Sequence, residues 1–433
     1  MEKLNNNLDK KANIKDFLID NIVTILFSVI CVLAIIASKE QPFMLISAVT
    51  ERLTRNSFLV LALLIPVVAG MGLNFSITIG AMAAQVAIII VAYFKIPTFL
   101  GLATVFVIAT PLAILLGWLI GRMLNKTIGQ EMIASMITGF FADGIYQLIF
   151  LFLVGTVIPV SGALVISGGV GLRNTINLNV KNDAGEIVGI GKSLDHIIQW
   201  PLFTMLLVIS LLAIGFYVYQ LIKKKGNQKK NIFNLAILIA LCVFSAVVVF
   251  SGKSMPRSIL MLKRVKISVF TALIVAAFAV FNIIFLKTKL GQTFRAVGHN
   301  MHIAEVSGIN IKRVRVLAII LSTMFAAWGH IIFLQNFGTL NTYGSHKQVA
   351  LFAVAALLIG GASVSRATVG QAFLGVLLFH TLFIVSPKAG LNLFGDPQLG
   401  EFFRTTVAYG VIGVSLGLFA WKQIVMNKNK KDK

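Results

Sequence analysis

This chain of 433 residues is poor in charge: only 12% of its residues are charged, against about 25% in ordinary soluble domains. Acidic residues are scarcest, with 15 Asp and Glu against 38 Lys and Arg, which gives a formal net charge of +23. Hydrophobic residues make up 58% of the chain, and the mean hydropathy is +0.91. No soluble core could bury so much apolar surface, so the composition excludes a soluble protein and predicts a membrane protein.

Residues for catalysis are also missing. The sequence contains no spacing of His, Cys, Asp and Glu typical of a metal site, no nucleophile elbow and no paired catalytic carboxylates. The two cysteines, Cys31 and Cys242, lie in apolar runs and form no disulfide framework. The stretch GEIVGIGKS (185–193) resembles a phosphate-binding loop, but Glu186 stands where the first glycine belongs. We therefore predict that the protein is not an enzyme, has no ATPase activity of its own, and binds no metal or cofactor.

What the sequence has in abundance is apolar runs of about 20 residues, the length that crosses roughly 30 Å of hydrocarbon. They predict an all-α, polytopic membrane protein with about 10–12 transmembrane helices. The expected helices are 17–38, 57–73, 75–94, 98–120, 132–157, 199–221, 231–251, 267–286, 316–334, 348–365, 368–385 and 404–421.

The basic residues predict the orientation of these helices. Most of them fall in loops that would share one side with both termini, so the positive-inside rule favours an N-in/C-in topology in the cell membrane and offers no reason to expect nucleic acid. The basic loop 251–266 is assigned outside, and either a neighbouring helix is miscounted or this loop is an amphipathic surface helix. The resulting divisions are a cytoplasmic tail (1–16), a first helix group (17–157), an extracytoplasmic insert (158–198), a second helix group (199–421) with a polar loop (287–315), and a basic cytoplasmic tail (422–433).

Ionisable residues inside the apolar runs are few, and charges at membrane depth are often functional. Asp143 has two open interpretations, a residue that lines a pathway or one member of a structural pair, and Glu131 is placed at a helix start. His330 and His380 are lone histidines on apolar helices, typical of hydrogen-bonded packing residues. Helices after Asp143 carry almost no charge, which argues against an ion-coupled carrier.

Two stretches combine small and polar residues, GLNFSITIGAMAAQVA (72–87) and LIGGASVSRATVGQAFLG (358–375). Small residues allow close helix packing, and their polar neighbours bond across helices or face a pathway. Gly360-Gly361 fits a broken helix and, equally, simple packing. The candidate substrate-path residues are Asn74, Ser76, Thr78, Gln85, Gly360 and Ser363. A weak internal echo between 124–135 and 286–297 fits two related halves or chance.

The most unusual stretch is LGQTFRAVGHNMHIAEVSGINIKRVRV (290–316), a polar segment between two apolar runs. Gly291 and Gly298 punctuate it, and Met301 to Val306 form a helix-favouring run. Ser307-Gly308 follows, and glycine just past a helix end is the usual cap. We expect a short surface helix there, followed by a basic turn.

The order of residues in this segment resembles the cytoplasmic coupling loop of ABC importer permeases. The most similar group serves simple sugars and nucleosides and is related to the branched-chain amino-acid permeases. The resemblance covers roughly 57–385, with GLNFSITIG and IGGASVSRATVGQAFLG also similar to the family pattern. The coupling-loop positions are Gly291, Arg295, Ala296, Gly298, Asn300, Ala304, Glu305, Ser307, Gly308 and Ile309.

The resemblance implies a permease subunit that translocates a small polar solute such as a simple sugar or nucleoside. It implies three kinds of protein partner: an ABC ATP-binding subunit docked on the coupling loop, an extracytoplasmic solute-binding protein, and a second permease, identical or homologous. The chain departs from the pattern at Asn74, where many sugar permeases have Asp, at Lys347-Gln348, where an acidic residue is common, and in the insert 158–198. The alternatives are a permease for branched-chain amino acids or another small solute, an ion-coupled secondary transporter, and a membrane-embedded enzyme.

Overall fold

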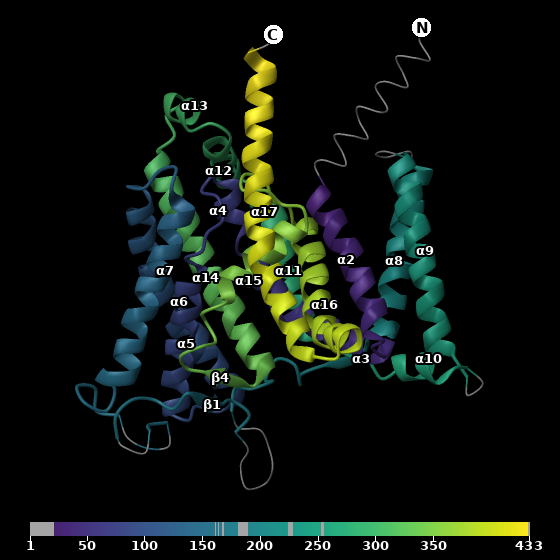
Figure 1. Cartoon of the computed structure of the whole chain (residues 1–433), viewed down its shortest axis with the longest axis horizontal. Helices are drawn as coiled ribbons and strands as arrows, with labels where there is room; N and C mark the ends of the chain where they lie inside the picture. Colours follow the sequence, from purple (N-terminus) through teal and green to yellow (C-terminus); the bar gives the residue numbers. More distant parts are fainter. Residues whose placement is uncertain are drawn as a thin grey trace.

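In the computed structural model, the described residues are 21–160, 162, 164–166, 169–180, 189–223, 228–252 and 255–431. The predicted tail 1–16 and part of the stretch 185–193 therefore lie outside the described residues. Helices dominate (Figure 1). They are α2 (Ile22–Ser38), α3 (Pro42–Leu61), α4 (Leu64–Val68), α5 (Ile77–Tyr93), α6 (Thr98–Leu124), α7 (Glu131–Leu148) with the π-helical turn Ile149–Leu153, α8 (Leu202–Ile222), α9 (Gln228–Phe250), α10 (Arg257–Leu262), α11 (Val269–Phe285), α12 (Lys289–His299), α13 (Met301–Val306), α14 (Ile311–Phe337), α15 (Val349–Ile359), α16 (Val369–Phe394) and α17 (Pro397–Lys431).

The all-α, polytopic membrane class is confirmed. Within the described residues, six helices are long and apolar enough to cross a membrane, or seven if α11 and α12 form one bent span. Helices α2, α5 and α15 are also apolar but are shorter than these candidate spans. The start of α2 and the end of α17 lie at the same end of the molecule as α12 and α13 (Figure 1). The N-in/C-in topology and the total number of crossings remain predictions.

The helix expected at 57–73 is wrong in its boundaries. The structure has instead a 20-residue helix from Pro42 to Leu61, a short helix α4, and a turn. Helix α3 includes Glu51, Arg52 and Arg55. These charged residues lower the mean hydropathy of the segment, so a search for apolar runs does not find it. After α4 the chain reverses at Gly70 and Gly72, whose φ angles of +75° and +68° favour glycine.

Most other expected helices agree with the structure to within about five residues. Helix α16, however, continues to Phe394, past the expected end at 385, and α17 (Pro397–Lys431) extends beyond 404–421 at both ends. The expected helix 348–365 ends early, at Ile359, because Gly360 and Gly361 break it before α16 begins. The same glycines also serve packing: a Cβ on Gly360 would lie 1.9 Å from the backbone oxygen of Gln371. Broken helix and close packing, two interpretations open in the sequence, therefore both apply here.

Four short strands pair the segments that connect the helices at the end of the molecule opposite α13 (Figure 1). Strand β1 (Thr175–Asn177), from the insert, pairs antiparallel with β4 (Thr339–Asn341), which follows α14. Strand β2 (Gln199–Pro201) pairs antiparallel with β3 (Lys266–Ser268), just before α11. The insert is thus attached to the starts and ends of membrane helices rather than hanging free.

The main core lies between α3, α5, α14, α15 and α16, where fully buried aliphatic residues such as Leu61, Ile88 and Val354 meet. The α8–α9 hairpin stands to one side (Figure 1) and packs at its base through a separate cluster that includes Phe203 and Val248. The basic loop 251–266 contains the short helix α10, which lies at the insert end of the molecule.

Candidate functional site

Helices α12 and α13 form the predicted polar surface segment. The chain bends by 71° between α11 and α12, so α12 leaves the direction of the apolar span. Helix α13 runs from Met301 to Val306, as expected, and Gly308 follows it with a φ of +80°. The backbone amide of Gly308 donates to the backbone oxygen of Glu305, and that of Ile309 donates to the backbone oxygen of Ala304. These bonds satisfy carbonyl groups at the end of α13, as a glycine cap does.

Side-chain caps explain why the chain folds into three separate helices here. The Thr288 hydroxyl accepts from the Gly291 amide and begins α12. The Asn300 side chain accepts from the Ile303 amide and begins α13, and that of Asn310 does the same for Arg313 and α14. Each cap satisfies a backbone donor that would otherwise be unpaired at a helix start.

Two glycines of α12, Gly291 and Gly298, allow this helix to pack directly against neighbouring backbone. A Cβ on Gly298 would stand 2.1 Å from the backbone oxygen of Val68, and one on Gly70 would stand 2.6 Å from Cα of Gly298. A Cβ on Gly291 would stand 2.1 Å from the backbone oxygen of Phe285. Since backbone cannot yield as a flexible side chain can, α12 is rigidly seated on α4 and on the turn after it.

Helix α13 presents an apolar tip to its surroundings. Ala304 is buried, whereas Ile303 is 61% exposed and Val306 is 78% exposed. Glu305 and Ser307, next to Val306 in the chain, are also exposed, as is Arg295 on α12. A small apolar patch rimmed by polar residues is typical of a protein interaction site.

A buried ion pair holds the segment to the rest of the bundle. Arg315, near the start of α14, is fully buried and lies 2.7 Å from the Glu131 carboxylate at the start of α7. The same guanidinium donates to the side-chain oxygen of Asn125 (3.0 Å) and the backbone oxygen of Leu124 (3.1 Å) at the end of α6. Arg315 therefore joins the start of α14 to the end of α6 and the start of α7.

A chain of polar side chains crosses the core. Nε2 of His346, in the loop before α15, lies 2.7 Å from the Asp143 carboxylate on α7. Its Nδ1 lies 2.9 Å from the side-chain oxygen of Gln85, whose amide nitrogen lies 3.2 Å from Nε2 of His330. The ammonium of Lys347 lies 3.6 Å from Asp143. Buried polar groups joined in this way specify a single helix arrangement.

A cavity of about 440 Å³ opens beside this chain, within the usual size range of small-molecule sites. Its walls come from α5, α7, α15, α17 and the loop before α15. The lining is aromatic and apolar with a few polar groups. It consists of Phe75, Thr78, Met136, Gly139, Phe140, Asp143, His346, Lys347, Gln348, Ala350, Leu351, Tyr409 and Ile412. Asp143 pairs with His346, as one earlier interpretation has it, and it also lines this cavity, while its place on a pathway stays a prediction.

The structure brings few of the candidate path residues to this cavity. Thr78 lines it, and Gln85 lies directly behind His346. Asn74 and Ser76 are buried in a local hydrogen-bond cluster that joins Ser322. Gly360 packs on α16, as described above. Ser363 lies in the exposed turn before α16, where its hydroxyl accepts from the Arg366 amide.

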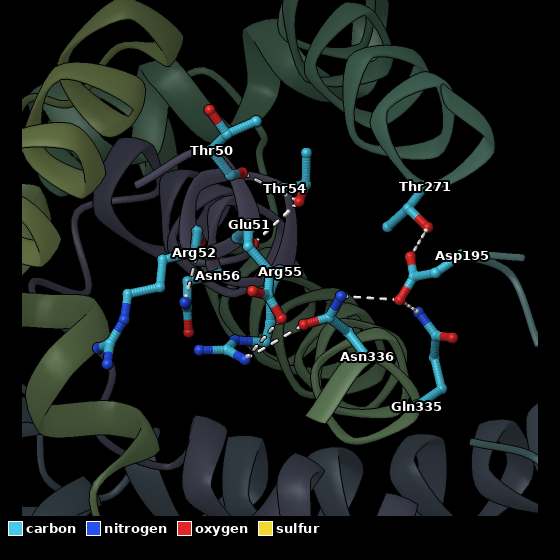
Figure 2. A network of polar contacts seen from close by, with 10 residues as sticks. All are labelled: Thr50, Glu51, Arg52, Thr54, Arg55, Asn56, Asp195, Thr271, Gln335 and Asn336. Atoms are coloured by element: carbon cyan, nitrogen blue, oxygen red, sulfur yellow. Dashed lines mark hydrogen bonds and ion pairs between the residues drawn. The ribbon is translucent and has the colours of Figure 1, made fainter. Parts of the chain in front are cut away.

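A second polar network fastens the insert at the other end of the molecule (Figure 2). The buried carboxylate of Asp195 accepts from the Thr271 hydroxyl on α11 at 2.6 Å. It also accepts from the side-chain amides of Asn336 (2.7 Å) and Gln335 (3.3 Å) at the end of α14. Asn336 in turn accepts from Arg55 of α3 at 3.2 Å. One carboxylate of the insert thus ties together the two helices that flank α12 and α13.

Tyr343 adds a further tie between the insert and the helices. Its hydroxyl lies 2.8 Å from the backbone oxygen of Leu172 and 3.1 Å from that of Phe150, positioned to donate to them. Burial raises the pKa of the Tyr343 phenol, which keeps the hydroxyl protonated as a donor.

Sequence reasoning missed most of these polar partners. Glu131 and Arg315 are 184 positions apart, and Asp143 and His346 are 203 apart. The only available signal was the presence of charged or polar residues within apolar runs, which does not identify a partner. Among the described residues, no group of three His, Cys, Asp or Glu side chains could hold a metal ion.

Comparison with known proteins adds a family to this geometry. The family described as branched-chain amino acid transport system / permease component matches residues 41–414, which covers the cavity, the α12–α13 segment and most of the membrane helices.

Several curated relatives match shorter stretches. The probable ABC transporter permease protein YphD of Escherichia coli (strain K12) is 32% identical over 33% of this chain and 41% of its own length. The ribose import permease protein RbsC of Bacillus subtilis (strain 168) is 31% identical over 33% of this chain and 42% of its own. The nucleoside ABC transporter permease protein NupB of Lactococcus lactis subsp. cremoris (strain MG1363) is 28% identical over 31% and 35%. The matches thus span about two fifths of the length of these relatives. No solved structure gives a significant match to the chain.

Proposed function

Since this chain belongs to the branched-chain amino acid transport system / permease component family, a family of multi-pass membrane permeases and not of enzymes, we propose that it is the transmembrane subunit of an ATP-driven importer. A separate ABC ATP-binding subunit supplies the energy, and the cargo is a small polar solute such as a simple sugar or a nucleoside.

The observation that carries this proposal is the α12–α13 segment. It has what a docking element needs: an exposed apolar tip at Ile303 and Val306, and a base that cannot slide because Gly298 touches the backbone of α4. Arg315 and Glu131 fix the same base to α6 and α7. A partner that moves α13 therefore moves several membrane helices with it.

The segment also has a short mechanical route to the cavity. Gly298 of α12 touches Gly70, and the turn that begins at Gly70 leads into Phe75 and Thr78, which line the cavity. When ATP binding draws the coupling helices of two permease subunits together, displacement of α12 shifts this turn. The cavity wall moves as a result, and access changes from one side of the membrane to the other.

The lining of the cavity supports a hydroxylated cargo. Aromatic rings of Phe75, Phe140 and Tyr409 offer apolar faces, while Asp143 and Gln348 offer polar groups that bond hydroxyls. Relatives named for ribose and for nucleosides agree with this class. A branched-chain amino acid is the alternative cargo, favoured by the family description.

The exposed apolar face of α7 indicates where a second permease subunit packs. Helix α7, one wall of the cavity, exposes Ile133, Ile137, Phe140 and Phe141. We propose that a second permease, identical or homologous, covers part of this face and completes a central path. A solute-binding protein delivers cargo at the end that carries the insert.

Uptake into proteoliposomes tests this function. The chain is reconstituted with the ATP-binding subunit and solute-binding protein found with it, and tritiated ribose, adenosine and leucine are supplied with internal or external ATP. We expect ATP-dependent accumulation of ribose or adenosine. If only leucine accumulates, the proposed sugar or nucleoside cargo is wrong and the cargo is a branched-chain amino acid. If a sodium or proton gradient drives uptake without ATP, the protein is an ion-coupled carrier and not an ABC importer subunit.

A further inference from the structure

A second, smaller cavity of about 110 Å³ lies between α3, α14, α15 and α16. Its walls are apolar, and all of its polar side chains are neutral hydrogen-bonding groups. The lining residues are Asn56, Leu59, Val60, Phe333, Ser345, Gln348, Val349, Phe352, Ala353 and His380. Since one water occupies about 30 Å³ in the liquid, this chamber holds only a few non-hydrogen atoms.

His380 is the unusual member of this lining. It is only 6% exposed, and its buried Nδ1 has no hydrogen-bond partner among the described residues. The sequence predicted a hydrogen-bonded packing histidine, and for Nδ1 this prediction is wrong. A buried polar atom without a partner is energetically costly, so the position calls for a group that enters the chamber and bonds to the imidazole.

Gln348 lies between this small chamber and the 440 Å³ cavity, because it lines both. It occupies the position just before α15, and its side chain makes no capping bond to that helix. Val349 faces the small chamber, and Ala350 and Leu351 face the large cavity. The exposed amide of Gln348 thus stands where a solute would pass from one space to the other.

Two cationic side chains lie near the chamber, over the ring of Phe383 next to His380. The ring of Phe383 lies 6.2 Å from that of His380 and has the guanidinium groups of Arg52 and Arg404 at 5.1 and 3.7 Å. Asn56 donates to the backbone oxygen of Arg52, one turn earlier on α3. Figure 2 shows Arg52 and Asn56 on the side of α3 away from Asp195. Phe333, however, lines the chamber and has the Arg55 guanidinium 5.3 Å from its ring centroid, so the chamber adjoins the network that holds the insert.

We infer that this chamber is a recognition subsite for the hydroxyl-bearing end of a neutral solute. The body of the solute occupies the 440 Å³ cavity, and one end passes Gln348 to bond with His380 and Asn56. Hydroxyls suit this site because they both donate and accept, as do the imidazole and amide groups that line it. The inference rests on the proposed import of a polar solute.

Access to the chamber is tested first, without any partner protein. Val349→Cys is made in a full chain whose native thiols are removed by Cys31→Ala and Cys242→Ala, and labelling by methyl methanethiosulfonate is timed. We expect Gln348→Ala to speed labelling several-fold, whereas the control Gln398→Ala leaves it unchanged. Equal rates with and without Gln348→Ala would overturn the connection between the two spaces, whatever drives transport.

Recognition is tested by comparing uptake of ribose with that of its monodeoxy analogues, or of adenosine with its deoxy forms if adenosine is the cargo. Wild type should discriminate against at least one analogue. His380→Phe should remove that discrimination and raise KM for the parent solute, and His380→Gln should preserve it. An equal loss of all uptake in both variants, or unchanged selectivity in His380→Phe, would contradict the subsite. If uptake does not depend on ATP but the variants change selectivity as expected, the proposed function is wrong and the recognition subsite is still supported.

Discussion

Replacing Ile303 and Val306 with serine removes both exposed apolar side chains of α13 without touching its caps. Full burial of such a side chain contributes about 1.5–3 kcal/mol. Ile303 is 61% exposed and Val306 is 78% exposed, so a partner can bury most of each. Scaled by these fractions, the two side chains together contribute about 2–4 kcal/mol to docking, or roughly 30- to 1000-fold in affinity.

The assay is equilibrium binding of the purified ATP-binding subunit to the permease in detergent, with a thermal unfolding curve for each variant. Val157→Ser is the matched control, because Val157 is 72% exposed but lies in the turn that follows Ile149–Leu153, next to the insert in sequence. We expect the double variant to fold normally and bind at least tenfold more weakly, while the control binds like wild type. Unchanged affinity in a folded double variant would refute the assignment of α13 as the docking tip.

Three further predictions concern packing and polar ties. Gly298→Ala should lower the unfolding temperature of the permease and its stimulation of the ATPase, because the added Cβ would lie 2.1 Å from a backbone oxygen. The control Gly410→Ala should change neither quantity, because Gly410 has open space around it. Arg315→Met should destabilise the fold by about 3–5 kcal/mol in chemical unfolding by leaving Glu131 unpaired, and adding Glu131→Gln should restore much of that loss. Asp195→Ala should increase hydrogen exchange in the insert and at the ends of α11 and α14, since three donors lose their acceptor; unchanged exchange would show that the carboxylate does not hold the insert.

The polar surface segment could be predicted from sequence because its signals are local. Ser307-Gly308 follows a short helix-favouring run, and the structure ends α13 at Val306. The apolar runs of about 20 residues likewise located most membrane helices. Helix α3 was not predicted because Glu51, Arg52 and Arg55 lower its hydropathy. In the structure, Arg55 lies near Glu51 and bonds to Asn336, and Arg52 lies over the Phe383 ring.

The cavity could not be predicted, because it is made by elements distant in sequence. Thr78 was a candidate path residue that reaches it, but Asn74 was not distinguishable from Thr78 by residue type alone. His346 carried no signal in the sequence, since only its contacts with Asp143 and Gln85 reveal its place. Long-range pairing and cavity shape depend on the folded chain rather than on any local pattern.

The most direct test of the account is a mild-detergent pull-down of the tagged chain from its native membrane, with the co-purifying proteins identified. The account predicts an ABC ATP-binding subunit that is lost when residues 301–308 are scrambled in a chain that still folds. If no ATP-binding subunit ever accompanies the wild-type chain, or if it remains with the folded scrambled chain, α12 and α13 do not couple this permease to ATP.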